Sequence, residues 1–132
     1  MLKSIMAITA VALLAVLLLP TSADKAAAEA GQLFIAAVEY DVVPGKVDEF
    51  LAALKENAAA SVKEPGCREL DVTVSQKDPN HVFIFEVYDD AAAVEAHTAT
   101  EHFKKYKAAT KDLVVKRQAQ QLWSVSMNMK GK

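Results

Sequence analysis

The chain has 132 residues, a net charge of −2 at pH 7 and 52% hydrophobic residues. Once its amino-terminal segment is set aside, it is long enough for one small domain with one core. Lysine and arginine do not gather into the basic face that nucleic-acid phosphates require, so nucleic acid is excluded as an expected partner. The single cysteine, Cys67, excludes an internal disulfide.

The first 23 residues have the pattern of a secretory signal peptide. Lys3 gives a positive start, residues 5–19 are almost unbroken apolar, and small residues end the segment at Ala23. The apolar run is shorter than the roughly 20 residues that span a bilayer, which favours cleavage after Ala23 over a retained anchor. A periplasmic or secreted protein without a stable membrane span is therefore expected.

An alanine-rich stretch and then a strand and a helix follow. Residues 24–31 have no period and are expected to form a tether to a domain at 32–129. Residues 32–43 are rich in β-branched and aromatic side chains on both parities, which predicts a strand covered on both faces. Apolar residues recur at helical spacing over 47–62, and proline and glycine at 65–66 end this amphipathic helix.

A hairpin is predicted next. Residues 68–75 alternate between apolar and polar side chains, as a strand with one wetter face does. Asp, Pro and Asn at 78–80 form a turn, and a second arm covers residues 81–88. Glu86 falls on the otherwise apolar side of that arm, so its carboxyl group needs a partner.

The last third predicts helices and a closing strand. Residues 91–107 are helical in pattern with a break at 98–100, a short helical piece covers 110–116, and a strand is expected over 120–129. The order strand, helix, strand, strand, helix, strand is the split βαβ arrangement. The fold class is therefore α+β, ferredoxin-like, with a four-stranded antiparallel sheet and helices on one face.

Six short motifs follow one another through the domain. They are Val43-Pro44-Gly45-Lys46 with Phe50-Leu51, Glu64-Pro65-Gly66-Cys67, Asp78-Pro79-Asn80, Phe85-Glu86-Val87-Tyr88, His97, and His102-Phe103. Their order and spacing resemble the antibiotic biosynthesis monooxygenase family. The resemblance is strongest to the small bacterial branch that includes quinol monooxygenases and the autoinducer-2 phosphate isomerase.

The resemblance implies a homodimer in which two sheets pack into a shared α+β barrel. It also implies a pocket between the sheet and the second helical region. The chemistry implied uses no cofactor, neither flavin nor metal: an electron-rich quinol or phenol is deprotonated and reacts with oxygen. Pairing agrees with the size of the domain, because a small chain leaves much apolar area exposed when it folds alone.

Three residues are the candidates for acid–base work. A neutral imidazole accepts a proton near physiological pH, so His97 and His102 are candidate catalytic residues, with His97 as the proton acceptor. Glu86 is the candidate orienting group for His97; the alternative is a structural acid tied to a backbone amide or to Arg68. A shared metal is not expected, because five residues of continuous helix turn the two rings apart, unless the break at 98–100 realigns them.

Five further residues are candidates for binding substrate. Aromatic rings could stack a flat ring in a pocket, or they could simply be core residues. Asn57 on the first long helix could donate to a substrate oxygen, or could be an exposed helix residue. These candidates are Tyr88, Phe103, Tyr106, Trp123 and Asn57.

The leading functional hypothesis is a cofactor-independent monooxygenase that oxidises a small quinol or polyphenol with molecular oxygen. A second hypothesis is an isomerase of a small carbonyl compound, similar to the autoinducer-2 phosphate isomerase. A third is a non-catalytic, dimeric module that binds a small molecule. Oxygen consumption separates the first from the others, since an isomerase and a binder need none.

Overall fold

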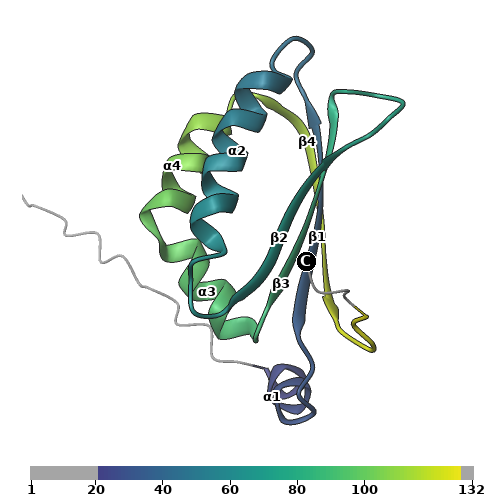
Figure 1. Cartoon of the computed structure of the whole chain (residues 1–132), viewed down its shortest axis with the longest axis vertical. Coiled ribbons are helices and arrows are strands. Elements are labelled where there is room, and N and C mark those ends of the chain that lie inside the picture. Colours follow the sequence, from purple (N-terminus) through teal and green to yellow (C-terminus); the bar gives the residue numbers. More distant parts are fainter. Residues whose placement is uncertain (1–20, 129–132) are drawn as a thin grey trace, which may run out of the picture.

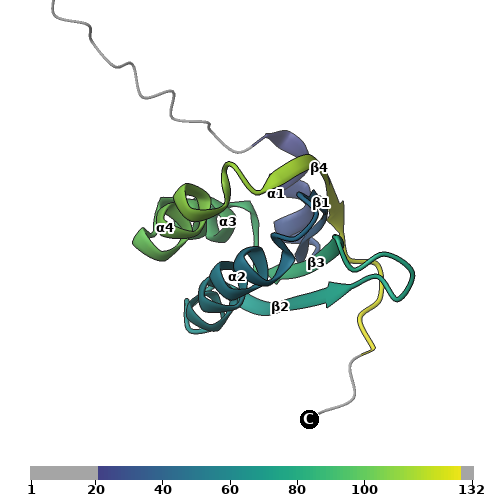
Figure 2. The ribbon, with the colours of Figure 1, turned by 90° about the horizontal axis from the view of Figure 1, so that it is seen from above.

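The computed structural model describes residues 21–128 and forms one antiparallel sheet with the helices of residues 47–110 packed on one side (Figures 1 and 2). In chain order the elements are α1 (Ser22–Glu29), β1 (Phe34–Val42), α2 (Val47–Ser61), β2 (Cys67–Val74), β3 (His81–Tyr88), α3 (Ala91–Ala99), α4 (Glu101–Thr110) and β4 (Val114–Trp123). The sheet order is β2-β3-β1-β4. From β1 onward the chain order is the predicted split βαβ order, so the ferredoxin-like α+β fold is confirmed.

A helix, α1, stands where a tether was expected over residues 24–31. Thr21 precedes it, and the Thr21 hydroxyl both donates to Asp24 Oδ2 at 2.7 Å and accepts from the Asp24 amide at 3.2 Å. This local cap and the high helix propensity of alanine explain the helix, and Ala27 is buried. The predicted signal peptide lies outside the described residues except for residues 21–23, which belong to this region. Within residues 21–128, no helix is long and apolar enough to cross a membrane.

The core lies between the helices and one face of the sheet. Alternate residues of β1 and β3 point toward the helices, as the pattern predicts, and all of them are buried except Ala36 and Glu86, which are partly buried. The core residues include Phe34, Val38, Tyr40, Phe50, Leu54, Val82, Ile84, Tyr88 and Tyr106. The opposite face carries no helix among α2, α3 and α4 (Figure 2), and we call it the open face.

The closing strand begins earlier than the sequence pattern predicted. Neither the helical piece expected at 110–116 nor the strand expected at 120–129 is correct, since α4 ends at Thr110 and β4 runs over 114–123. The β4 strand pairs along the whole of β1, with Phe34 opposite Trp123. This long-range pairing outweighs the local helical pattern, and residues 124–128 lie beyond the strand.

The turn between α2 and β2 touches α3 at Gly66. A Cβ atom built at Gly66 would lie 2.5 Å from the Cβ of Ala93, and Ala93 cannot move without its helix. We expect Gly66→Ala to lower the free energy of unfolding by about 1–3 kcal/mol through overpacking, measured by urea denaturation. The double variant Gly66→Ala, Ala93→Gly restores part of the loss. A single variant as stable as the native chain would contradict this contact.

Candidate active site

The helical region is broken at Thr100, and the break brings two histidines together. Thr100 has an extended backbone, and its hydroxyl donates to the His97 carbonyl at 2.7 Å while accepting from the Phe103 amide at 3.3 Å. On a continuous helix a five-residue separation would turn the rings about 140° apart. The break instead places the ring centroids of His97 and His102 5.7 Å apart. The condition under which the two rings were expected to realign is therefore met.

The carboxylate of Glu64 lies between the two imidazole rings. Glu64 Oε1 is 2.9 Å from His97 Nδ1 and 2.8 Å from His102 Nε2. Only 3% of the His97 side chain is exposed, against 16% for Glu64 and 23% for His102. We call Glu64, His97 and His102 the histidine cluster.

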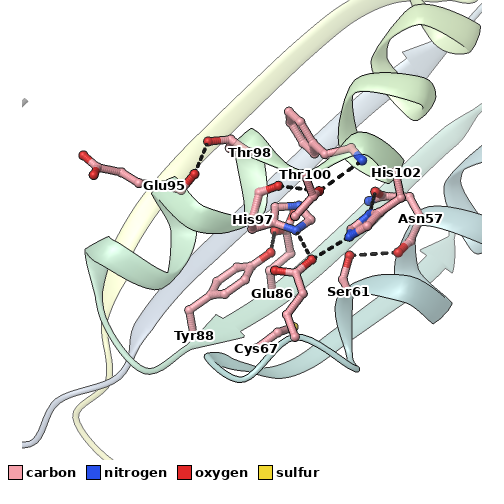
Figure 3. Close-up of polar contacts among 12 residues, drawn as sticks. Asn57, Ser61, Cys67, Glu86, Tyr88, Glu95, His97, Thr98, Thr100 and His102 are labelled. Carbon is pink, nitrogen blue, oxygen red and sulfur yellow. Dashed lines mark hydrogen bonds and ion pairs between the residues drawn. The ribbon is translucent and has the colours of Figure 1, made fainter. Parts of the chain in front are cut away.

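Asn57 fixes the second nitrogen of His102. Asn57 is a buried residue of α2, and its side-chain oxygen lies 2.8 Å from His102 Nδ1 (Figure 3). It is therefore not the exposed helix residue of the alternative interpretation. Its backbone oxygen accepts a hydrogen bond from Ser61 one turn later. The contact holds His102 between an amide oxygen and a carboxylate oxygen, which sets the orientation of the ring.

Glu86 does not orient His97 through a hydrogen bond; Glu64 has that position. Glu86 Oε2 instead accepts a hydrogen bond of 2.7 Å from the Tyr88 hydroxyl. Of the alternative partners, Arg68 is wrong, because it pairs with Asp89 at the start of the loop after β3. Glu86 projects from the same sheet face as Tyr88 and is close enough to His97 to interact electrostatically.

The carboxyl group of Glu86 is held at an energetic cost. Burial raises its pKa above the usual 4.5, although the Tyr88 hydroxyl, His97 and Arg117 act to lower it and Glu64 acts to raise it. The folded chain thus binds this proton more tightly than the unfolded chain. Its stability consequently decreases as the pH rises from about 4.5 through the raised pKa of Glu86.

Glu86→Gln should therefore stabilise the fold at neutral pH. The amide can still accept the hydrogen bond of Tyr88 and carries no charge, so we expect a gain of about 1 kcal/mol at pH 7. The gain should disappear below about pH 4.5, where the native carboxyl group is protonated in both states. Urea denaturation across this pH range measures the effect, and a gain that is independent of pH would contradict it.

Two of the four predicted aromatic residues, Tyr88 and Phe103, contact the His97 ring. The His97 ring centroid is 4.9 Å from that of Phe103 and 5.5 Å from that of Tyr88. Tyr106 lies next to Phe103, at 6.1 Å, and its buried hydroxyl has no hydrogen-bond partner within the described chain. Trp123 packs edge-on against Phe34 at 5.3 Å on β4, two strands away from Tyr88.

Two surface hollows flank the histidine cluster. One of about 280 Å³ lies between α2 and α4, and His102, Asn57 and Tyr106 are among its lining residues. The other, of about 420 Å³, lies at the α2–β2 turn and the start of α3, and Glu64 is among its lining residues. Small molecules and ions can therefore approach the cluster from two sides.

Glu64 was quoted as part of a motif but was not predicted as a site residue. It follows the end of α2, where the carbonyl groups give the helix a partial negative charge. A carboxylate is unfavourable there unless a cationic or hydrogen-bond-donating group compensates for it. That position, together with two histidines downstream, is the signal in the sequence that could have identified it.

The chain matches known proteins over the region that contains this site. The family model for antibiotic biosynthesis monooxygenases matches residues 33–109. The isomerase of (4S)-4-hydroxy-5-phosphonooxypentane-2,3-dione from Salmonella paratyphi B is 35% identical over 72 residues, which are 54% of this chain and 75% of that one. The Klebsiella pneumoniae protein of the same name is 38% identical over 66 residues, 50% of this chain and 67% of that one.

Solved structures agree with these matches. A Bacteroides thetaiotaomicron structure, provisionally assigned as an antibiotic biosynthesis monooxygenase, has a TM-score of 0.72 and 35% identity, covering 80% of this chain and 99% of that one. A Nitrosomonas europaea structure with the same provisional assignment has a TM-score of 0.70 at 24% identity, covering 72% of this chain and 92% of that one, and supports the fold alone. The family match spans more than half of the sequence and includes the whole histidine cluster. The chain therefore belongs to the antibiotic biosynthesis monooxygenase family.

Proposed function

We propose that this protein is an isomerase that moves a proton between adjacent carbons of a small hydroxy-ketone. The histidine cluster carries the proposal, since it holds two imidazoles that each lie within hydrogen-bond distance of one carboxylate. The isomerase name of the curated relatives supports the same reaction class. This reverses our order of preference from the sequence, where oxidation of a quinol came first.

The proposed reaction needs one base and one acid, and no oxidant. The base removes a proton from the carbon that carries the hydroxyl group, while the acid protonates the neighbouring carbonyl oxygen to give an enediol. The same groups then return a proton to the second carbon as the first oxygen becomes a carbonyl. Atoms and electrons balance within the substrate, and an imidazole can serve in both steps near neutral pH.

We assign His102 to contact the substrate and His97 to hold Glu64. His102 is partly exposed and lines the hollow between α2 and α4, whereas His97 is buried beneath it. The Glu64 carboxylate lies against one nitrogen of each ring, so it can stabilise whichever imidazole becomes charged. The predicted roles of the two histidines are thus exchanged, with His97 positioning rather than accepting the substrate proton.

We further propose that the substrate carries no phosphate group, unlike the compound in the relatives' name. Of the residues that line the α2–α4 hollow, only Lys105 is a permanent cation, and its ammonium group pairs with Glu56. A phosphate there would also face Glu49. The secretory pattern of residues 1–23 favours export to the periplasm, where phosphorylated metabolites are scarce, and we propose that location for the mature chain.

Proton exchange in deuterated water tests the isomerase. Hydroxy-diones with and without a phosphate are incubated with the chain, and loss of the carbon-bound proton next to the carbonyl is followed by NMR. We expect exchange to fall by about a hundredfold or more in His102→Ala and to be unchanged in His81→Asn, whose histidine lies outside the cluster. Protein-independent exchange across the whole panel would overturn the proposal.

Quinol oxidation remains the second candidate. Tyr88 and Phe103 flank His97, and such rings suit a flat aromatic substrate. Consumption of oxygen with a panel of reduced quinols, corrected for autoxidation and compared with His97→Ala, tests it. Ligand binding without exchange or oxygen uptake would instead favour the dimeric binding module.

We also propose a homodimer that forms through the open face of the sheet. Phe83 and Phe85 of β3 and Leu122 of β4 lie on that face and are each roughly 40% exposed. A second copy would cover these side chains and give β1 the cover on both faces that its apolar pattern requires. This surface lies opposite the histidine cluster, so pairing leaves both hollows accessible.

A further inference from the structure

Beyond proton transfer, we propose that the histidine cluster is a binding site for a divalent transition-metal ion, with Zn²⁺ as its probe. The ligands are a carboxylate oxygen of Glu64, Nδ1 of His97 and Nε2 of His102. These three ligand atoms all lie within 4.8 Å of one another, and no other group of three or more such residues within 21–128 could hold an ion in this way.

The donor chemistry fits zinc. Two imidazole nitrogens and one carboxylate oxygen form a ligand set that holds Zn²⁺ and leaves a coordination position open for water. Ligand atoms around tetrahedral zinc are separated by roughly 3.3 Å. Glu64 Oε1 is already 2.8 and 2.9 Å from the two nitrogens. Side-chain rotations that move the ligand atoms by about 1 Å therefore complete the tetrahedral geometry.

The contacts of His102 can accommodate a cation at this place. A neutral imidazole has a single N–H, yet the two nitrogens of His102 face Asn57 Oδ1 and Glu64 Oε1, both acceptors. If Nδ1 donates to Asn57, the lone pair of Nε2 points at a carboxylate oxygen. Two facing lone pairs need a proton or a metal ion between them.

Outer contacts also resemble those that support a metal ligand. A metal-binding histidine usually donates its second N–H to an oxygen that fixes the ring, and Asn57 Oδ1 occupies that position for His102. The His97 ring contacts the rings of Tyr88 and Phe103. These aromatic rings limit the access of competing water to the ligands.

An ion has a route to the cluster. His102 lines the hollow between α2 and α4, whose lining carries two carboxylates, Glu49 and Glu56, against one ammonium group, that of Lys105. The lining therefore carries a small net negative charge, which does not repel a cation. Glu64 lines the second hollow, where a water molecule could reach the open coordination position.

Metal binding and proton transfer exclude each other in this arrangement. The ion occupies the lone pairs that would carry protons, so zinc should inhibit the isomerase. Only this inhibition rests on the proposed function. The metal site is independent of it, because metal binding is measured without a substrate.

Another histidine of the same chain provides a matched control. His81 lies against the carboxylates of Asp41 and Glu39 on neighbouring strands, with Nε2 3.6 Å from Glu39. It is partly exposed, like His102, but has no second histidine beside it. His81→Asn therefore removes an imidazole with acidic neighbours and leaves the histidine cluster intact.

Equilibrium dialysis of the tag-free, chelator-stripped chain against Zn²⁺ tests the site, with metal analysis of the retained protein. We expect one zinc per chain with a Kd in the micromolar range or tighter. His102→Ala should weaken binding by about a hundredfold or more and Asn57→Ala by about tenfold, while His81→Asn should not change it. Co²⁺ in place of zinc should give the visible absorption of a tetrahedral site in the native chain and in His81→Asn.

Circular dichroism confirms that each variant is folded, and Glu64→Gln serves as a second test that removes the charge at constant shape. Binding weaker than millimolar in the native chain would overturn the proposal, as would unchanged binding in folded His102→Ala and Glu64→Gln. Zinc binding without any isomerase activity would uphold the metal site and reject the proposed function. Activity without zinc binding would do the reverse.

Discussion

We expect Glu64→Gln to lower the turnover number of the proposed proton exchange by about a hundredfold or more while the chain stays folded. The carboxylate is the only described acceptor that both imidazoles of the cluster share. An amide at the same position cannot stabilise a charged imidazole in the transition state, and acid–base catalysis contributes about 10²–10⁴ to a rate. NMR exchange rates at saturating and at low substrate concentration give kcat and KM separately.

The effect should appear in kcat and leave KM nearly unchanged, because Glu64 does not line the hollow where substrate is proposed to bind. Glu64→Asp keeps the charge and should recover part of the rate. Glu39→Gln is the control, since Glu39 is an exposed carboxylate beside His81 that does not line the hollow. Equal loss in Glu39→Gln, or full activity in Glu64→Gln, would remove Glu64 from the mechanism.

Local patterns in the sequence were sufficient for the central elements of the fold. The helical period over 47–62 and the proline and glycine at 65–66 predicted α2 and its end within one residue. Alternation and the turn residues at 78–80 predicted the hairpin of β2 and β3. The break at 98–100 was also correct, because threonine competes for backbone hydrogen bonds at that point.

The two ends of the chain were less predictable, for opposite reasons. At α1 a local cap and alanine propensity made a helix that a search for amphipathic periodicity misses. At β4 local pattern favoured a helix, and pairing with β1, some 80 residues earlier, decided the outcome. No local window of sequence contains that pairing.

The candidate site was predicted in its histidines and missed in its carboxylate. His97 and His102 were identified from their chemistry, and both are in the cluster. Glu86 was chosen over Glu64 because an acid on an apolar strand face is visible in the pattern. The contact of Glu64 with two rings depends on how α2, α3 and α4 pack, which residue spacing does not reveal.

The open face of the sheet leads to the second prediction with a large effect. Its exposed apolar side chains come from two strands: Phe83 and Phe85 from β3 and Leu122 from β4. Stable interfaces bury about 800 Å² per partner. In a symmetric pair each copy contributes the same patch, so one substitution alters the interface twice.

Phe85→Glu should therefore convert the proposed dimer into a monomer. Two carboxylates buried in an apolar interface cost about 2–3 kcal/mol each, which weakens association by roughly a thousandfold or more. Light scattering on a size-exclusion column measures the mass of each variant. Val62→Glu is the matched control, because Val62 is 49% exposed at the end of α2 on the helical side.

A monomeric native chain would reject the dimer itself, whereas a dimer that persists in Phe85→Glu would move the interface to another surface. Since the histidine cluster lies on the helical side of the sheet, a folded Phe85→Glu monomer that still binds zinc and exchanges protons would show that each copy contains a complete site.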